Sequence, residues 1–252
     1  MKNKILLSML ATFLVGCGGE SSSSSSSTSF SQGGSMARFA ISGNYLYTIN
    51  KREMNVLDIA DASTPKNLNK IHVPFDVETL FAYEDNLYIG SSSGLYIYDK
   101  TTPTQPTRIS MLRHVQSCDP VVVSEDIAYV TLHTNSSCWQ GAGDNRLEII
   151  DVKIPETPTL IKAIDMWEPK GLAVDGENLF ICDGSNGLKV YQINKSDNND
   201  TVNISIDLKD SKSEIDCYDV IANNKILVVS NGKDIRQFNY LTFPMEELGN
   251  IK

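Results

Sequence analysis

The segment VLDIADASTP at residues 56–65 recurs twice further along the chain, as YIYDKTTPTQP at 96–106 and EIIDVKIPETP at 148–158. Each copy has a short apolar stretch ending in aspartate, and a proline follows seven residues after that aspartate. A fixed period of this kind is typical of repeat architectures, in which one small unit is used several times. The recurrence therefore predicts a fold built from repeated short strands.

The pattern extends to five units over residues 36–252, with about 43 residues in each unit. Four short strands with turn residues between them are predicted for every unit. The opening strands are predicted at 39–41, 80–82, 121–123, 172–174 and 220–222, and the next strands at 44–47, 86–88, 127–129, 178–180 and 225–227. The third strands are predicted at 55–58, 96–99, 148–151, 189–192 and 236–239, and the weaker fourth strands near 68–71, 108–112, 160–164, 204–208 and 247–251.

Four-stranded units of this length predict an all-β fold, a five-bladed β-propeller with four-stranded antiparallel blades. Each sheet has two apolar faces that only neighbouring units can cover, so we expect the units to close into a ring. A β-sandwich would not need so regular a repeat, and a parallel β-helix would need a shorter one. These two folds are the alternatives.

The repeated segment resembles the LVIVD repeat of bacterial secreted β-propellers. The segments SMARFAISGNYLY (35–47), SCDPVVV (117–123), GLAVDGENLFICDGSNGLKVY (171–191) and YDVI (218–221) resemble the lipoproteins of that group. Units four and five depart from the pattern, because Gln192 and Asn239 replace the aspartate. The resemblance implies a propeller fold and a surface location, and it implies no activity. We interpret the recurring aspartate as a structural cap of the turn that leads to the outermost strand.

Residues 1–16 have the features of an export signal, with Lys2 and Lys4 ahead of an apolar stretch at 5–15. Eleven helical residues span about 16 Å, which is too short for a bilayer core of roughly 30 Å. Leu14-Val15-Gly16-Cys17 resembles the bacterial lipobox. We therefore expect Cys17 to be lipidated and residues 17–35, rich in Gly and Ser, to form a flexible tether. An ordinary signal peptide with a chance cysteine is the alternative.

The predicted address is the bacterial cell envelope, with the protein held on the membrane by its lipid. Gly18 follows the cysteine in place of the aspartate that resembles an inner-membrane retention signal, which favours the outer membrane. The 252-residue chain has a formal charge of −9, and loss of the leader leaves 20 basic against 31 acidic residues, a charge of −11. So acidic a surface argues against a nucleic-acid partner.

Five charged residues are predicted to converge where the opening strands enter the central channel of the propeller. Basic neighbours are expected to depress the pKa of the carboxylates in this set. The group is either a ring of mutually paired surface charges or a binding site for a small polar ligand or a cation. No metal is assigned, because two basic residues would oppose it. The candidate ligand-binding residues are Arg38, Glu78, Asp119, Lys170 and Asp219.

The third unit carries about ten extra residues within 134–146. In an antiparallel blade this insertion lies at the rim where Cys118 begins the opening strand, so we predict a Cys118–Cys138 disulfide. That bond would hold Trp139 beside the channel mouth, either as a recognition residue or as a plug. Cys182 and Cys217 are interpreted as buried free thiols, with a bridge between them as the alternative.

The sequence favours a non-catalytic binding scaffold with an envelope protein or a glycan as partner. The alternative is a glycan-active hydrolase or lyase that uses the mouth carboxylates as acid and base. No catalytic residue is assigned and no cofactor is expected, because no nucleophile elbow, phosphate loop or zinc-binding pattern occurs.

Overall fold

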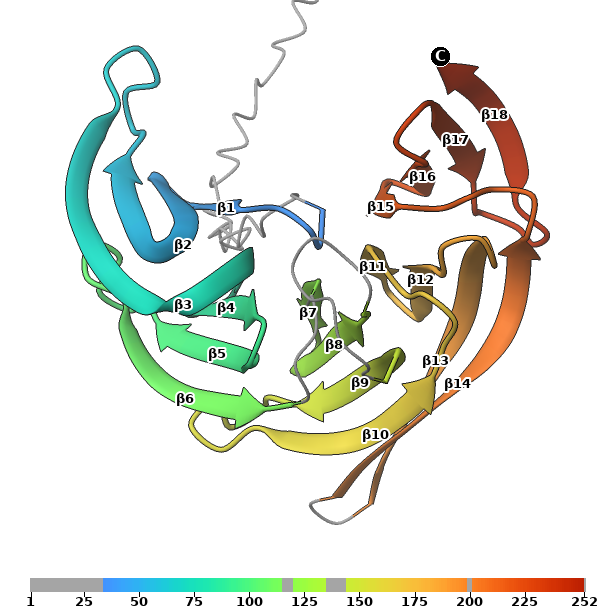
Figure 1. Cartoon of the computed structure of the whole chain (residues 1–252), viewed down its shortest axis with the longest axis horizontal. Helices are drawn as coiled ribbons and strands as arrows, with labels where there is room; N and C mark the ends of the chain where they lie inside the picture. The colour runs from blue at the N-terminus through green and yellow to red at the C-terminus, as the bar shows by residue number, and fades with distance from the viewer. Residues whose placement is uncertain (1–33, 115–119, 135–143, 199–200, 252) are drawn as a thin grey trace, which may run out of the picture.

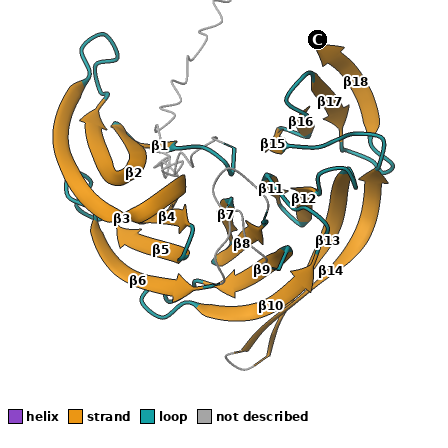
Figure 2. Ribbon diagram, in the orientation of Figure 1, coloured by secondary structure: helices purple, strands orange, loops and turns teal. Residues whose placement is uncertain are grey.

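The computed structural model describes residues 34–114, 120–134, 144–198 and 201–251. Within these ranges the chain forms strands, turns and loops and no helix (Figure 2). The described residues therefore include no helix that is long and apolar enough to cross a bilayer. The predicted all-β class is confirmed.

The N-terminal sheet contains six antiparallel strands that follow one another in chain order. They are β1 (Phe39–Ser42), β2 (Tyr45–Asp58), β3 (Lys66–Tyr83), β4 (Asn86–Ser91), β5 (Gly94–Asp99) and β6 (Thr107–Arg113). β2 doubles back near Lys51, whose φ is 32°, so that the amide of Ile59 donates to the carbonyl of Asn44 over 2.8 Å. β3 bends at Asp76, with φ 56°, and pairs with β2 through its first part and with β4 through its second. Predicted units one and two are therefore joined in one sheet through β3.

Units three, four and five each form a separate four-stranded antiparallel sheet, as predicted. The third unit forms β7 (Val121–Ser124), β8 (Ile127–Leu132), β9 (Arg146–Asp151) and β10 (Thr159–Asp165). The fourth forms β11 (Leu172–Asp175), β12 (Asn178–Cys182), β13 (Leu188–Asn198) and β14 (Thr201–Lys212). The fifth forms β15 (Asp219–Asn223), β16 (Ile226–Ser230), β17 (Ile235–Asn239) and β18 (Glu246–Ile251).

The recurring aspartate caps the turn that leaves the third strand of the first three units, as interpreted from the sequence. Asp58, Asp99 and Asp151 each accept a hydrogen bond on Oδ1 from the amide two residues further on, at 2.9, 2.7 and 2.9 Å. Asn239 makes the same bond to Leu241 at 2.9 Å, so the amide replaces the carboxylate without loss of the cap. This side-chain turn is a local structural device, and it explains the repeat without any catalytic role.

Consecutive sheets pack face to face through their apolar side chains, and the opening strands lie toward the centre (Figure 1). The aromatic residue of the second strand is buried at each of these interfaces. Tyr47, Tyr88, Tyr129 and Phe180 are all at most 2% exposed.

The expectation that the units close into a ring is wrong for the part of the chain that the structure describes. The sheet β15–β18 and the strands β1 and β2 lie on opposite sides of an opening in Figure 1, and no extensive contact joins them. Two-sided apolar sheets predict that each face has a neighbour. They do not fix the packing angle between neighbours, which decides how many sheets a closed ring needs.

Candidate functional site: the central cavity and its charged end

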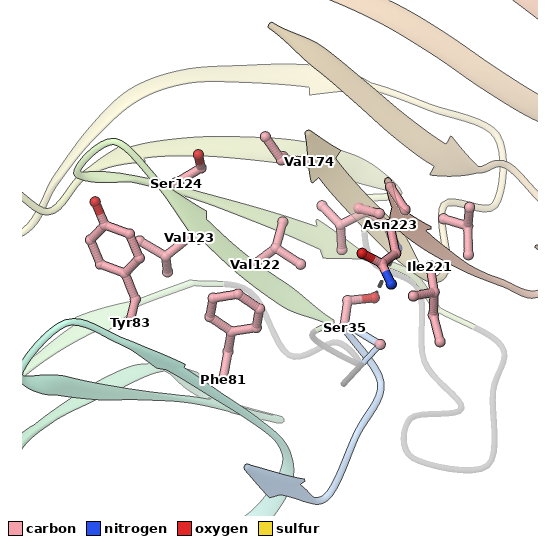
Figure 3. A pocket seen from close by; sticks show the side chains of 14 residues that line it. Ser35, Phe81, Tyr83, Val122, Val123, Ser124, Val174, Ile221 and Asn223 are labelled. Carbon is pink, nitrogen blue, oxygen red and sulfur yellow. Dashed lines mark hydrogen bonds between the residues drawn. The ribbon is translucent and has the colours of Figure 1, made fainter. Parts of the chain in front are cut away.

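A cavity of about 230 Å³ lies where the opening strands of the sheets converge (Figure 3). The second part of β3 and the strands β7, β11 and β15 form its wall, and the segment at residues 34–35 covers one end. Its apolar residues are Phe81, Val122, Val123, Leu172, Ala173, Val174, Val220, Ile221 and Ala222, and its other residues are Gly34, Ser35, Tyr83, Ser124 and Asn223.

The two ends of this cavity differ in chemistry because the wall strands run in the same direction along it. Tyr83, Ser124 and Asn223 are the last residues of their strands, so they form a polar rim beside the turns. At this rim the carboxylates of Glu84 and Asp126 contribute to raising the pKa of Tyr83, after burial as the first cause. The turn end of the cavity is therefore polar and negatively charged.

Ser35 closes the other end, where the wall strands begin. Its hydroxyl accepts a hydrogen bond from the amide of Leu172 at 2.8 Å, and its carbonyl accepts one from Val121 at 3.4 Å. Ser35 is 2% exposed. The packed part of the chain thus includes residues 34 and 35, which the sequence had placed in the tether.

Asp219 lies directly beside Ser35, at the first position of β15. A Cβ on Gly171 would come within 2.0 Å of its Oδ1, and a Cβ on Gly34 within 2.9 Å of its Oδ2, so both glycines leave room for the carboxyl group. Burial raises the pKa of Asp219 to about 6, although hydrogen bonds from the Val220 amide and the Ser35 hydroxyl oppose the shift. Asp219 is therefore an acid that titrates near neutral pH.

Glu78 and Arg38 lie close enough for the guanidinium to act on the carboxylate. Burial nevertheless raises the pKa of Glu78, with Asp76 adding to the rise and Arg38 opposing it. The expectation that basic neighbours depress the pKa of the mouth carboxylates is thus wrong for Glu78 and Asp219. The reason is that loss of hydration outweighs the attraction of Arg38 at Glu78 and the two hydrogen bonds at Asp219.

Lys170 contacts neither Glu78 nor Asp219 in the ion pairs of the described residues. Its ammonium lies 3.2 Å from Glu168 and 5.6 Å from the centre of the Tyr218 ring. Burial first, and the charge of Lys170 second, lower the pKa of His133 to about 4, so this histidine is neutral at physiological pH.

The structure thus distributes the predicted mouth residues over three local groups. Arg38 with Glu78, Asp219 with Ser35, and Lys170 with Glu168 form these groups, and none of the four predicted residues that the structure describes lines the cavity. Asp119, Trp139 and the predicted Cys118–Cys138 pair lie outside the described residues, as does Cys17.

Two functional features were missed by sequence reasoning. Ser35 looked like part of a low-complexity stretch, and no local pattern distinguishes it from the serines before it. The polar rim at Tyr83, Ser124 and Asn223 was also missed, although the common turn position of these residues was a signal that could have revealed it.

Cys182 and Cys217 form a disulfide, so the interpretation of two free thiols is wrong. Cys182 ends β12, and Cys217 forms an isolated bridge with Gly184 just beyond that strand, so the two Cα atoms lie 4.8 Å apart. The bond joins the fourth unit to the segment that leads into the fifth unit. Among the residues the structure describes, no group of three or more His, Cys, Asp or Glu side chains could hold a metal ion.

The sequence comparison identifies an LVIVD repeat at residues 33–70. No curated protein matches the chain in sequence.

Several solved structures are similar in fold. A functionally unknown protein from Desulfotomaculum acetoxidans has a TM-score of 0.64 at 8% identity, over 89% of this chain and 70% of that protein. The Pseudomonas aeruginosa periplasmic gluconolactonase PpgL has a TM-score of 0.58 at 11% identity, over 83% and 67%. Kluyveromyces lactis Hsv2 has a TM-score of 0.56 at 13% identity, over 83% and 60%. The chain thus spans about 60% of the length of Hsv2, and the likeness concerns the fold alone.

Proposed function

Because the chain is an LVIVD-repeat β-propeller protein, we propose that it is a lipid-anchored binding scaffold of the bacterial cell envelope. In this proposal five four-stranded blades carry the central cavity, and Cys17 carries the lipid after residues 1–16 are removed. The observation that supports binding most directly is the preformed cavity, which has an apolar wall, a polar rim and one closed end. Preformed concave sites of this composition are typical of small-ligand recognition.

The chemistry of the rim indicates which ligand would fit. Apolar wall residues such as Val122 and Val174 suit the body of a small molecule, while Tyr83, Ser124 and Asn223 supply hydrogen-bonding groups. The carboxylates of Glu84 and Asp126 favour a ligand with hydroxyl or ammonium donors over an anion. An envelope glycan that carries amino groups combines these properties.

A matched pair of variants tests the cavity. Ser124 and Ser42 occupy the same position in their units, since each is the last residue of an opening strand, but only Ser124 lines the cavity. We expect the full chain and its Ser42→Trp variant to bind amino-sugar oligosaccharides on a glycan array, and Ser124→Trp to lose that binding. Equal binding by all three proteins would refute the cavity as the site.

Anchoring has a separate test that does not depend on the ligand. Inhibition of the lipoprotein signal peptidase by globomycin is expected to make an uncleaved, lipid-modified precursor accumulate in cells that express the chain. Unchanged processing, or normal membrane retention of a Cys17→Ala variant, would remove the anchor from the proposal.

An enzyme is the second candidate, and it is favoured by burial, which raises the pKa of both Glu78 and Asp219, since a general acid needs a raised pKa. Such an enzyme would act on glycans at the end of the channel where Ser35 and Asp219 lie. Because the similar structure PpgL is a gluconolactonase, sugar lactones are included among the substrates to be tested. A screen on polysaccharides and lactones, repeated with Glu78→Gln and Asp219→Asn, decides the matter. Turnover that either variant abolishes would replace the scaffold proposal.

A further inference from the structure

The third strand of the fourth unit departs from the repeat. In the second, third and fifth units this strand ends at the capping residue, which is Asp99, Asp151 or Asn239. Gln192 holds the same position, because it pairs with the first residue of the second strand, but β13 continues beyond it to Asn198. β14 pairs with this continuation, so the two strands project beyond the neighbouring sheets (Figure 1).

The continuation of β13 forms one wall of a second cavity, with a volume of about 140 Å³, between the third and fourth units. Ile193 and Lys195, both beyond the capping position, line the cavity from the fourth unit. Ile127 and Tyr129 line it from the third unit, and both are at most 2% exposed. The segment that departs from the repeat is therefore the segment that bounds this cavity on one side.

The second cavity adjoins the central cavity. Ser124 of the third unit and Val174 of the fourth line both of them (Figure 3). The central cavity has a volume of about 230 Å³, so neither cavity alone reaches the roughly 300 Å³ at which the range of small-molecule sites begins, whereas the two together exceed it. A ligand that extends across Ser124 and Val174 would therefore occupy a site of typical size.

The charged residues of the second cavity offer a ligand both acceptors and a donor. Glu125 and Glu177 are exposed, and their carboxylates accept hydrogen bonds. The ammonium of Lys195 donates to the carbonyl of Glu125 at 3.2 Å, which holds it beside the cavity with two further N–H groups. Gln192 donates to Oε2 of Glu177 at 2.8 Å, so the residue that replaces the capping aspartate positions a carboxylate of the cavity. A sugar ring has hydroxyls that both donate and accept, and it therefore matches both kinds of partner.

We propose that this cavity is a second subsite, which takes the next sugar residue of a glycan whose first residue occupies the central cavity. The inference rests on the proposed function, because it requires an amino-sugar glycan in the central cavity. It adds that the glycan passes Ser124 and Val174 and runs outward between the third and fourth units. Glu177 and Lys195 contact its second residue, so the protein binds a disaccharide in preference to a monosaccharide.

Calorimetric titration of the full exported chain in detergent, with glucosamine and with its β-1,4-linked dimer, tests this subsite. We expect the dimer to bind about tenfold more tightly than the monomer, because only the dimer reaches the charged groups of the second cavity. The variant Glu177→Gln/Lys195→Met removes one carboxylate and one ammonium from that cavity. In this variant the affinity ratio of dimer to monomer should fall to a small fraction of its original value.

Glu53→Gln/Lys70→Met is the matched control. It also removes one carboxylate and one ammonium, which lie 3.0 Å apart on the first unit, and it should keep the original ratio. Equal affinities of the unchanged chain for monomer and dimer would overturn the second subsite and leave the central cavity as a binding site. A ratio that Glu177→Gln/Lys195→Met leaves unchanged would do the same. Failure of both sugars to bind would instead overturn the amino-sugar proposal and this inference with it.

Discussion

The two faces of the sheet β15–β18 have similar apolar residues and very different surroundings. The face toward β11–β14 buries Leu227 and Phe238, and it lies next to the Cys182–Cys217 bond and to Tyr240, whose ring meets that of Phe180 edge to face at 4.9 Å. The opposite face leaves Ile221, Ile235 and Ile251 exposed. The comparison teaches that strand alternation places apolar residues on both faces of a sheet. Only the face that a neighbouring sheet covers is buried and so contributes to the free energy of unfolding.

The largest expected effect separates the two faces directly. Phe180→Ala, on the buried side, should lower the free energy of unfolding by about 3–5 kcal/mol, because it leaves a cavity in a packed interface. Ile235→Ala, on the open side, should lower it by about 1 kcal/mol or less. Urea unfolding of dilute mature protein, followed by circular dichroism, measures both. Equal losses would mean that the open face is covered in solution.

Removal of the disulfide is expected to have the next largest effect. The bond closes a loop with a sequence separation of 35 residues. Cys182→Ala/Cys217→Ala should therefore lower the free energy of unfolding by roughly 3–4 kcal/mol, mainly because the unfolded chain gains freedom. The same urea measurement serves, and a reductant should remove the difference between wild type and variant. A difference that persists under reduction would trace the effect to packing.

Asp219 tests the inner end of this sheet, where it meets the channel. Its pKa is raised to about 6, so the folded state holds a proton that the unfolded state releases near pH 4. The free energy of unfolding should therefore fall as the pH rises from about 4 to about 6, by on the order of 2 kcal/mol. Asp219→Asn should remove this part of the dependence, and the exposed Asp165→Asn should keep it. A steeper or unchanged profile in Asp219→Asn would contradict the assignment.

The smallest effect concerns a polar contact on the buried side. The Tyr240 hydroxyl donates to Oδ2 of Asp175 at 2.9 Å, and Lys225 lies 2.5 Å from the same oxygen. Burial raises the pKa of Asp175, but these two partners together hold it below its usual value. Tyr240→Phe should cost about 1 kcal/mol and raise the pKa of Asp175 in an NMR titration. Tyr218→Phe, on a half-exposed ring, should change neither.

Much of the fold was predictable because it depends on local signals. The period of the strand-aspartate-proline segment located the strands, and the side-chain turns at Asp58, Asp99 and Asp151 confirm the structural role assigned to the aspartate. The continuity of units one and two through β3 was not predictable, since a bend at a single residue, Asp76, replaces the expected break between them.

The site was less predictable because it depends on distances between units. Alignment placed Asp219 at a strand entry, where β15 begins, but Glu78 lies inside the continuous strand β3. Burial, which the sequence does not give, reverses the expected direction of the pKa shift of both residues. The pairing of Cys182 with Cys217 depends on the approach of adjacent units, and the role of Ser35 depends on a path across the centre that serine repeats do not encode.

That path has a mechanical consequence. The backbone and hydroxyl of Ser35 are bonded to Val121 and Leu172, on two different sheets, before the chain reaches β1. Tension applied ahead of residue 34 is therefore delivered to the middle of the molecule and shared between β7 and β11, instead of peeling β1 from its edge. A domain pulled from this point should unfold cooperatively, at a higher force than a domain whose strands are pulled off one at a time from an edge.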